Sequence, residues 1–334
     1  MRSLRLLLVI HLVACTLDVA GHTDDDDQEE DDDDENGPVP PPPDSACAEV
    51  PDAGPSGSWR HTSSTLVAHL GDPHHRGIDL VAAADDAVQT LGGRLTYGPT
   101  DKDLEDEDVD VFACANGTWE NLGRATTDDN GQYSIDSAGF IAPNGEPIYS
   151  ILEGDLSCAD QYNFLLPPGT KVVVSDIDGT LTTDDAELIM QVADESYVPK
   201  MMTGGDAMLQ AWDAKGYPII YLTARSHQFR SESRVWLRDF DFPAGPMITS
   251  NMTNEADVYK TAWLKRMFGA FGWVPVAAYG NADTDIIAYE NAGIPKDKTF
   301  IVGPLAGNSG TVAIPNMDYT QHTASFVAAQ PNNQ

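Results

Sequence analysis

The stretch VVVSDIDGTLTTDD (Val172–Asp185) decides how this sequence is interpreted. Its three valines form an apolar run that is typical of a strand buried on both faces. The run leads directly to Asp176 and Asp178, two carboxylates that repel each other and are costly to bury. Two such groups at the end of a buried strand indicate a site that also supplies positive charge.

Beyond this strand, apolar strand patterns alternate with helical patterns. We expect an α/β domain over 169–320, with a Rossmann-like parallel sheet and helices on both faces. Fewer than 40 residues separate Thr180 from the second strand, so no large cap domain is expected. The expected strands are 171–177, 217–225, 276–280 and 298–303, and the expected helices are 204–216, 231–240, 257–272 and 284–293.

Polar residues follow three of these strands, and a lysine lies early in a helix. Because the carboxyl ends of parallel strands meet at one edge of a sheet, we expect these side chains to converge. Carboxylates, a hydroxyl and an amine are the groups that phosphoryl transfer needs, with Mg²⁺ to neutralise phosphate charge. The set comprises Asp176, Asp178, Gly179, Thr180, Thr223, Ala224, Arg225, Lys260, Asn281, Asp283 and Asp285, with Lys265 as an alternative to Lys260.

The preceding region has a different pattern. Short runs of β-branched and aromatic residues at 92–98, 108–114, 118–127 and 131–136 are separated by turn signals. They predict a small antiparallel β-sandwich over 59–168. Of the cysteines, Cys114 and Cys158 both fall in this region and are the first candidates for a disulfide, although Cys47 is a further possible partner.

The N-terminus reads as an export signal. Residues 1–15, MRSLRLLLVIHLVAC, have two arginines and an apolar core too short to span a bilayer. The ending LVAC resembles a bacterial lipobox, which predicts lipidation at Cys15 and a lipoprotein anchored at the outer membrane or cell surface; an ordinary cleaved signal peptide is the alternative. Residues 16–58 are expected to be a disordered acidic and proline-rich tether, and 321–334 a flexible tail.

The charge is strongly negative. The formal net charge is −34, and removing the eleven acidic residues of Asp24–Glu35 still leaves −23. Nucleic acid is therefore not expected as a partner, because phosphate backbones are bound by lysine and arginine. An anionic substrate would also need a cation to offset repulsion.

The motifs DIDGT, YLTAR, the helical lysine and GNADTD resemble the four motifs of the haloacid dehalogenase superfamily of phosphatases. This resemblance implies that Asp176 is the nucleophile and that Asp178 is the general acid/base. It implies that Thr223 and Lys260 hold the phosphoryl group. The implied substrate-binding residues are Gly179, Thr180, Thr223, Ala224 and Arg225, and the implied Mg²⁺ ligands are Asp176, Asp178, Asp285 and Asn281, with Asp283 as a rival ligand.

Longer stretches resemble the lipin-type phosphatidate phosphatase domain, and equally the C-terminal domain of membrane-associated phosphatidylinositol transfer proteins. The transfer-protein domains generally lack the full acidic pair, whereas this chain keeps Asp176 and Asp178. The resemblance implies a Mg²⁺-dependent phosphatase of phosphatidate or a related phosphomonoester at a membrane surface. A non-catalytic phosphatidate-binding module, and a phosphatase of a soluble phosphomonoester or phosphoprotein, remain alternatives.

Overall fold

The computed structural model describes residues 45–83, 88–138, 145–187, 190–191, 197–250 and 255–333, which form two compact units. The first unit lies within 45–77, 90–136 and 146–161, and the second within 78–89, 137–145 and 162–333. The expected signal peptide, Cys15 and the acidic run lie outside the described residues. None of the described helices has the length and apolar character needed to cross a membrane.

The first unit is built from antiparallel strands. Its longest strands are β6 (Asp108–Ala115) and β7 (Thr118–Thr126), and β6 also pairs antiparallel with β9 (Pro147–Leu152). Alternate residues of β6 point into a core, because Val109, Val111 and Ala113 are completely buried. This supports the expected sandwich-like region. Its other elements are α1 (Thr62–Ala68), β1 (Arg76–Gly77), β3 (Val88–Arg94), β4 (Thr96–Tyr97), β5 (Lys102–Asp103), β8 (Gln132–Ala138) and the start of β10 (Cys158–Leu166).

A disulfide joins Cys47 to Cys114, so the expected Cys114–Cys158 bond is wrong. Cys114 lies near the end of β6, and the segment before the sandwich returns to this strand. The backbone oxygen of Glu49 accepts a hydrogen bond from Trp119 Nε1 at 3.0 Å, and Cys47 is buried. The last part of the expected tether is therefore packed against the strands.

The second unit contains a six-stranded sheet in the order β13-β12-β11-β14-β15-β16. Every neighbouring pair is parallel, which confirms the expected parallel sheet. The strand with the three valines is β11, which lies between β12 and β14 in the interior of the sheet. The strands are β11 (Lys171–Ser175), β12 (Ile219–Ser226), β13 (Met247–Ser250), β14 (Val274–Gly280), β15 (Thr299–Ile301) and β16 (Val312–Ala313).

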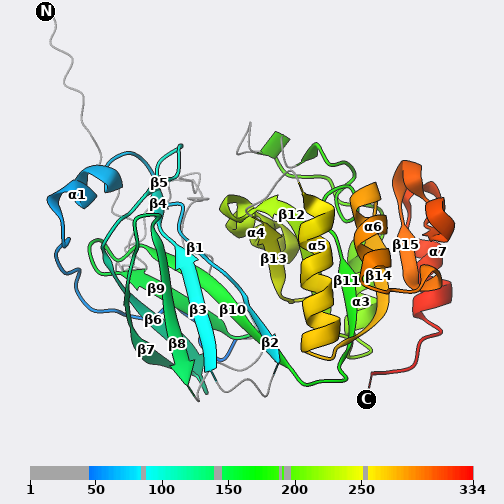
Figure 1. The fold of residues 1–334 in the computed structure, drawn as a ribbon, viewed down its shortest axis with the longest axis horizontal. Helices are drawn as coiled ribbons and strands as arrows, with labels where there is room; N and C mark the ends of the chain where they lie inside the picture. Colours follow the sequence, from blue (N-terminus) through cyan, green and yellow to red (C-terminus); the bar gives the residue numbers. More distant parts are fainter. Residues whose placement is uncertain are drawn as a thin grey trace, which may run out of the picture. The chain divides into compact units, whose positions relative to one another are not determined.

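Helices cover both faces of this sheet (Figure 1). Val173 faces a core with side chains of α3 (Gly205–Asp213) and α4 (Arg230–Asp239), whereas Val172 and Val174 face a second core with α5 (Ala256–Lys265) and α6 (Asp283–Asn291). The alternation of β11 thus explains its continuous apolar sequence. Shorter helical turns are η1 (His227–Phe229), η2 (Arg266–Ala270), η3 (Lys296–Lys298), η4 (Gly303–Leu305), η5 (Asn308–Gly310) and η6 (Pro315–Met317).

Two segments outside the expected 169–320 domain belong to the second unit. β2 (Leu80–Ala83) pairs parallel with the end of β10, so the upstream region is not purely antiparallel, and Val81 joins the core shared with α5 and α6. At the other end, α7 (Thr320–His322) and η7 (Thr323–Val327) replace the expected flexible tail. Their side chains include buried apolar surface, which gives this segment a reason to fold.

Candidate active site

The DIDGT motif forms a tight loop directly after β11. The N–H of Asp176 donates to the backbone oxygen of Tyr279 at 3.0 Å, while the oxygen of Ile177 accepts from Leu181 N–H at 2.8 Å. Gly179 lies at φ +62°, where residues other than glycine are strained. A Cβ atom at this glycine would also lie 2.0 Å from Asn281 Nδ2. The turn and the close approach of Asn281 therefore both require glycine.

Lys260 joins the two carboxylates that the sequence analysis places at different strand ends. Its Nζ atom donates to Asp176 Oδ1 and to Asp285 Oδ1, both at 2.7 Å. All three residues are buried, with exposed fractions of 4% or less. Lys260 projects from α5, so the helix brings a cation to the edge where β11 and β14 end. Lys265, the alternative, is exposed on the last turn of the same helix.

The charges of this cluster do not balance. One ammonium is shared by two buried carboxylates, and Asp178 adds a third nearby. Burial is the main cause that raises the pKa of Asp176 to about 7; Lys260 opposes this shift, and the charges of Asp285 and Asp178 add to it. The pKa of Lys260 is also raised, because the two carboxylates outweigh the cost of burial. Since Arg225 pairs with Asp178, three carboxylates face two cations, and when all three are ionised one excess negative charge is left for a further cation to offset.

Within the part of the chain that the structure describes, no three acidic, histidine or cysteine side chains form a ready metal cluster. The residues nevertheless suit Mg²⁺, which prefers oxygen ligands and few protein donors. Asp176, Asp285, the Asn281 amide oxygen and the Asp178 backbone carbonyl are the groups that would hold it.

Asp285 is fixed by the start of α6. Its Oδ2 atom accepts the N–H groups of Asn281 at 3.0 Å and Ala282 at 3.1 Å. The Cβ of Asp285 would be 2.5 Å from a Cβ atom placed at Gly280, so this carboxylate needs the glycine that ends β14. Asp283, the rival ligand, is exposed on the first turn of α6. The structure thus favours Asp285 over Asp283.

The end of β12 contributes Thr223 and Arg225, and both face Asp178. Thr223 is completely buried, and its Oγ1 atom lies 3.5 Å from Asp178 Oδ2. Arg225 forms an ion pair with Asp178, with 2.8 Å between Nη2 and Oδ1. The family resemblance implies that Arg225 binds substrate, but in the structure its guanidinium contacts a protein carboxylate. Ala224 lies between these two residues and is half-buried.

Asn281 connects the DIDGT loop to a residue that the sequence analysis does not assign. Its Nδ2 atom donates to Asp185 Oδ1 at 2.8 Å, and its Oδ1 atom is 3.4 Å from Thr180 Oγ1. Asp185 lies in the run TTDD directly after the DIDGT motif. This acidic residue close to the motif is the sequence feature that could have predicted its role. Tyr319, whose OH donates to the Thr180 backbone oxygen at 3.1 Å, has no such signal because it lies 139 residues away.

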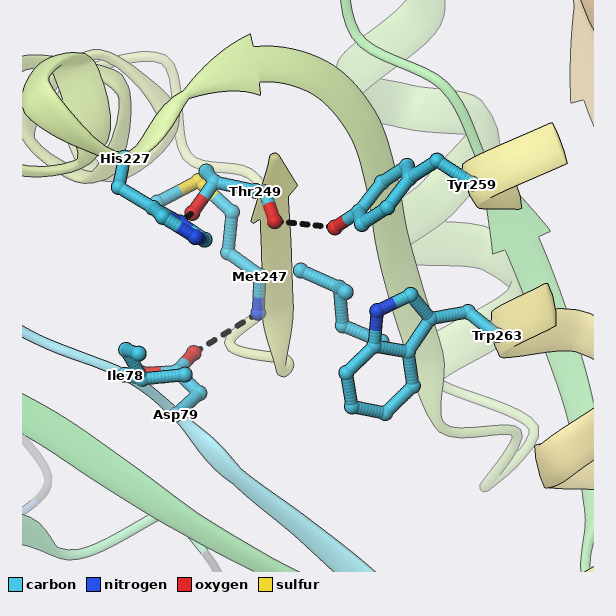
Figure 2. Close-up of a pocket in the computed structure, with 8 residues that line it drawn as sticks. Ile78, Asp79, His227, Met247, Thr249, Tyr259 and Trp263 are labelled. Carbon is cyan, nitrogen blue, oxygen red and sulfur yellow. Dashed lines mark hydrogen bonds between the residues drawn. The ribbon is translucent and has the colours of Figure 1, made fainter. Parts of the chain in front are cut away.

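A cavity of about 210 Å³ lies beside α5 and the edge strand β13 (Figure 2). Asp79 accepts the Met247 N–H at 2.8 Å, and the Tyr259 hydroxyl donates to the Thr249 backbone oxygen. Side chains thereby satisfy outward-facing backbone groups of β13. The lining is largely apolar and aromatic; it comprises Ile78, Asp79, His227, Met247, Ile248, Thr249, Tyr259 and Trp263.

Comparison with known families gives two adjoining matches. Residues 173–303 match the family described as PITM 1-3, LNS2 domain, and residues 73–165 match PITM 1-3, beta-sandwich domain. The first match contains the acidic loop, Thr223, Lys260 and Asp285. The second covers most of the expected β-sandwich at 59–168.

Individual relatives agree with these matches. Protein retinal degeneration B of Drosophila melanogaster is 31% identical over 263 residues, covering 76% of this chain and 20% of that protein. Human membrane-associated phosphatidylinositol transfer protein 3 is 29% identical over 290 residues, covering 84% and 29%. Human membrane-associated phosphatidylinositol transfer protein 2 is 28% identical over 256 residues, covering 75% and 18%. The chain thus spans less than a third of the length of these relatives.

These relatives correct one set of expectations. All three are animal proteins and two are named as membrane-associated, so the expected bacterial lipoprotein at an outer membrane or cell surface is wrong. Residues 1–15, with Cys15, lie outside the described residues. The resemblance to transfer-protein domains is supported, and the two human relatives are named as phosphatidylinositol transfer proteins and not as phosphatases.

Proposed function

We propose that this chain, which resembles an LNS2 domain preceded by a PITM-type β-sandwich domain, is a Mg²⁺-dependent phosphatase of an amphiphilic phosphomonoester such as phosphatidate. The observation that carries the proposal is the Lys260 bridge between Asp176 and Asp285, with Thr223 and Asp178 at the same sheet edge. The proposed nucleophile, a cation, a hydroxyl and two further carboxylates thus come together from four segments of the chain.

Each of these groups has a part in the proposed reaction. Asp176 attacks the phosphorus atom and forms an aspartyl-phosphate as the bond to the ester oxygen breaks. Asp178 gives a proton to the departing alcohol and later takes one from the water that attacks the aspartyl-phosphate. Thr223 and Lys260 donate hydrogen bonds to phosphoryl oxygens as their charge changes. Bound Mg²⁺ would neutralise phosphate charge that the acidic protein otherwise repels.

The cavity in Figure 2 supports a substrate with an apolar part. It is lined by Tyr259 and Trp263 of α5, the helix that carries Lys260, and by His227, which directly follows β12. Ile78, Met247 and Ile248 add apolar surface. Apolar pockets with a few polar groups are typical of ligand sites. None of the lining residues is among those assigned to phosphoryl transfer, and we propose that the cavity takes the apolar part of a lipid phosphomonoester.

Phosphate release tests the proposal. The substrates are phosphatidate in phosphatidylcholine vesicles, glycerol 3-phosphate and p-nitrophenyl phosphate, each with Mg²⁺ and with EDTA. We expect release from phosphatidate that requires Mg²⁺ and is lost in Asp176→Asn, which keeps the size of the side chain. Equal release by the wild type and Asp176→Asn would refute the phosphatase.

Binding of phosphatidate without hydrolysis is the second candidate. It is favoured by the two human relatives, which are named as phosphatidylinositol transfer proteins. The same assay separates the two functions when vesicle co-sedimentation is added. If both proteins release no phosphate but sediment with phosphatidate vesicles and not with phosphatidylcholine vesicles, the site is a binding site.

A further inference from the structure

The side chain of Arg225 is completely buried and forks onto one carboxylate. Its Nε atom lies 3.1 Å from Asp178 Oδ1 and 3.0 Å from Oδ2, and its Nη2 atom lies 2.8 Å from Oδ1. A planar guanidinium that donates to both oxygens fixes the orientation of a carboxylate as well as its position.

The Arg225 guanidinium is also fixed by a hydrogen bond on the side away from Asp178. Its Nη1 atom donates to Ser233 Oγ at 2.7 Å, and Ser233 Oγ donates to the backbone oxygen of Phe229 at 2.5 Å. Ser233 is completely buried on α4. The contacts of Nε, Nη1 and Nη2 are therefore directed at protein groups. This arrangement makes Arg225 poorly suited to bind substrate.

The fork treats the two oxygens of Asp178 differently. Oδ1 accepts from both Nε and Nη2, whereas Oδ2 accepts from Nε and faces Thr223 Oγ1 at 3.5 Å. Oδ2 can carry a proton while Oδ1 keeps its two bonds to the guanidinium. Oδ2 is also the oxygen on the side of Thr223, where the phosphoryl group is proposed to bind.

We propose that Arg225 is a positioning residue that presents Asp178 Oδ2 for proton transfer to the leaving alcohol. The inference rests on the proposed phosphatase function. The proton moves from Oδ2 to the ester oxygen as the phosphorus–oxygen bond breaks, and water returns a proton to Oδ2 when the aspartyl-phosphate is hydrolysed. Since an error of about 1 Å in such a geometry can cost about 10²-fold in rate, the fork has a direct kinetic consequence.

The test uses leaving groups that differ in their need for a proton. A p-nitrophenolate leaves readily without protonation, whereas an alkoxide leaves poorly without it. In Arg225→Lys, which keeps a positive charge but not the fork, we expect kcat for an alkyl phosphate to fall about 10²-fold. We expect kcat/KM for p-nitrophenyl phosphate, which reports only the steps up to release of the phenolate, to fall less than about 10-fold, because that leaving group needs no proton. KM for the alkyl phosphate should change little.

Ser233→Ala is the second variant, because it keeps the Arg225–Asp178 ion pair and removes only the hydrogen bond from Arg225 Nη1 to Ser233. It should show the same selective loss of kcat for the alkyl phosphate to a smaller degree, and it tests the proposal even if Arg225→Lys does not fold. Combining Arg225→Lys with Asp178→Asn should be no slower on the alkyl phosphate than Asp178→Asn alone. If the wild type is active but Arg225→Lys loses equal activity on both substrates, or only its KM rises, the positioning role is wrong. A wild type inactive on both substrates would instead overturn the proposed function.

Discussion

Lys260 Nζ lies 2.7 Å from Asp176 Oδ1, and both side chains are buried where β11 ends. The same ammonium contacts Asp285. Lys260→Met keeps most of the volume and removes the charge, leaving two buried carboxylates without their cation. We expect the free energy of unfolding to fall by about 3–5 kcal/mol, and kcat to fall about 10²–10³-fold. Urea unfolding and phosphate release measure the two effects.

Lys265→Met is the matched control for this variant. Lys265 lies on the last turn of the same helix but is exposed. It should unfold within about 0.5 kcal/mol of the wild type and keep its activity. If Lys265→Met were the variant that lost activity, the assignment of Lys260 would be wrong.

Gly179→Ala tests the close approach of Asn281. An added Cβ would meet Asn281 Nδ2 at 2.0 Å and Asp185 Oδ1 at 2.4 Å, so the pair between these side chains must separate. Gly293→Ala is the control, because Gly293 has φ +80° and open space at the Cβ position. Both variants bear the left-handed backbone cost of about 1–2 kcal/mol, but only Gly179→Ala should raise the Mg²⁺ concentration needed for half-maximal activity. Equal Mg²⁺ requirements would argue against a role for Asn281 in holding the metal.

Asp79 holds two arginines of α4 and is predicted to stabilise the second unit. Its carboxylate contacts Arg230 and Arg234 and accepts the Met247 N–H. Burial opposes its ionisation, but the two guanidinium groups outweigh burial and lower the pKa of Asp79. Asp79→Asn removes the counter-charge and should destabilise the protein by about 3–5 kcal/mol in urea unfolding. The exposed Asp297→Asn should have almost no effect, and equal stability of both variants would contradict the prediction.

His322 makes stability depend on pH. Its Nε2 atom lies 2.9 Å from the Tyr279 hydroxyl, and burial lowers the pKa of His322 to about 4 from 6.5. The unfolded chain therefore binds a proton between pH 6.5 and 4 that the folded protein does not, so stability is lost as pH falls through this window. His322→Gln should reduce the slope of unfolding free energy against pH by about one proton there. The exposed His69→Gln should keep the wild-type slope; an unchanged slope in His322→Gln would refute the assignment.

Much of the site could be predicted because it depends on local patterns. The valines before Asp176 predict a buried strand, and parallel strands bring their carboxyl ends to one edge. The sequence therefore predicts that Lys260 and Asp285 lie close to Asp176, although it does not predict their particular contacts. The roles of individual residues were harder to predict. Arg225 was expected to bind substrate, and Asp185 was given no role.

The sequence by itself determined the parallel sheet and the convergence of its polar strand ends, because strand and helix patterns are written in neighbouring residues. The tertiary structure alone decided which partners meet over long separations. Asp79 finds Arg230 across 151 residues, and Cys114 pairs with Cys47 and not with Cys158. The sequence offers 53 acidic residues and four cysteines, and its local patterns do not single out these pairs. Burial of particular groups in the packed core makes one choice favourable, and no local pattern records that choice.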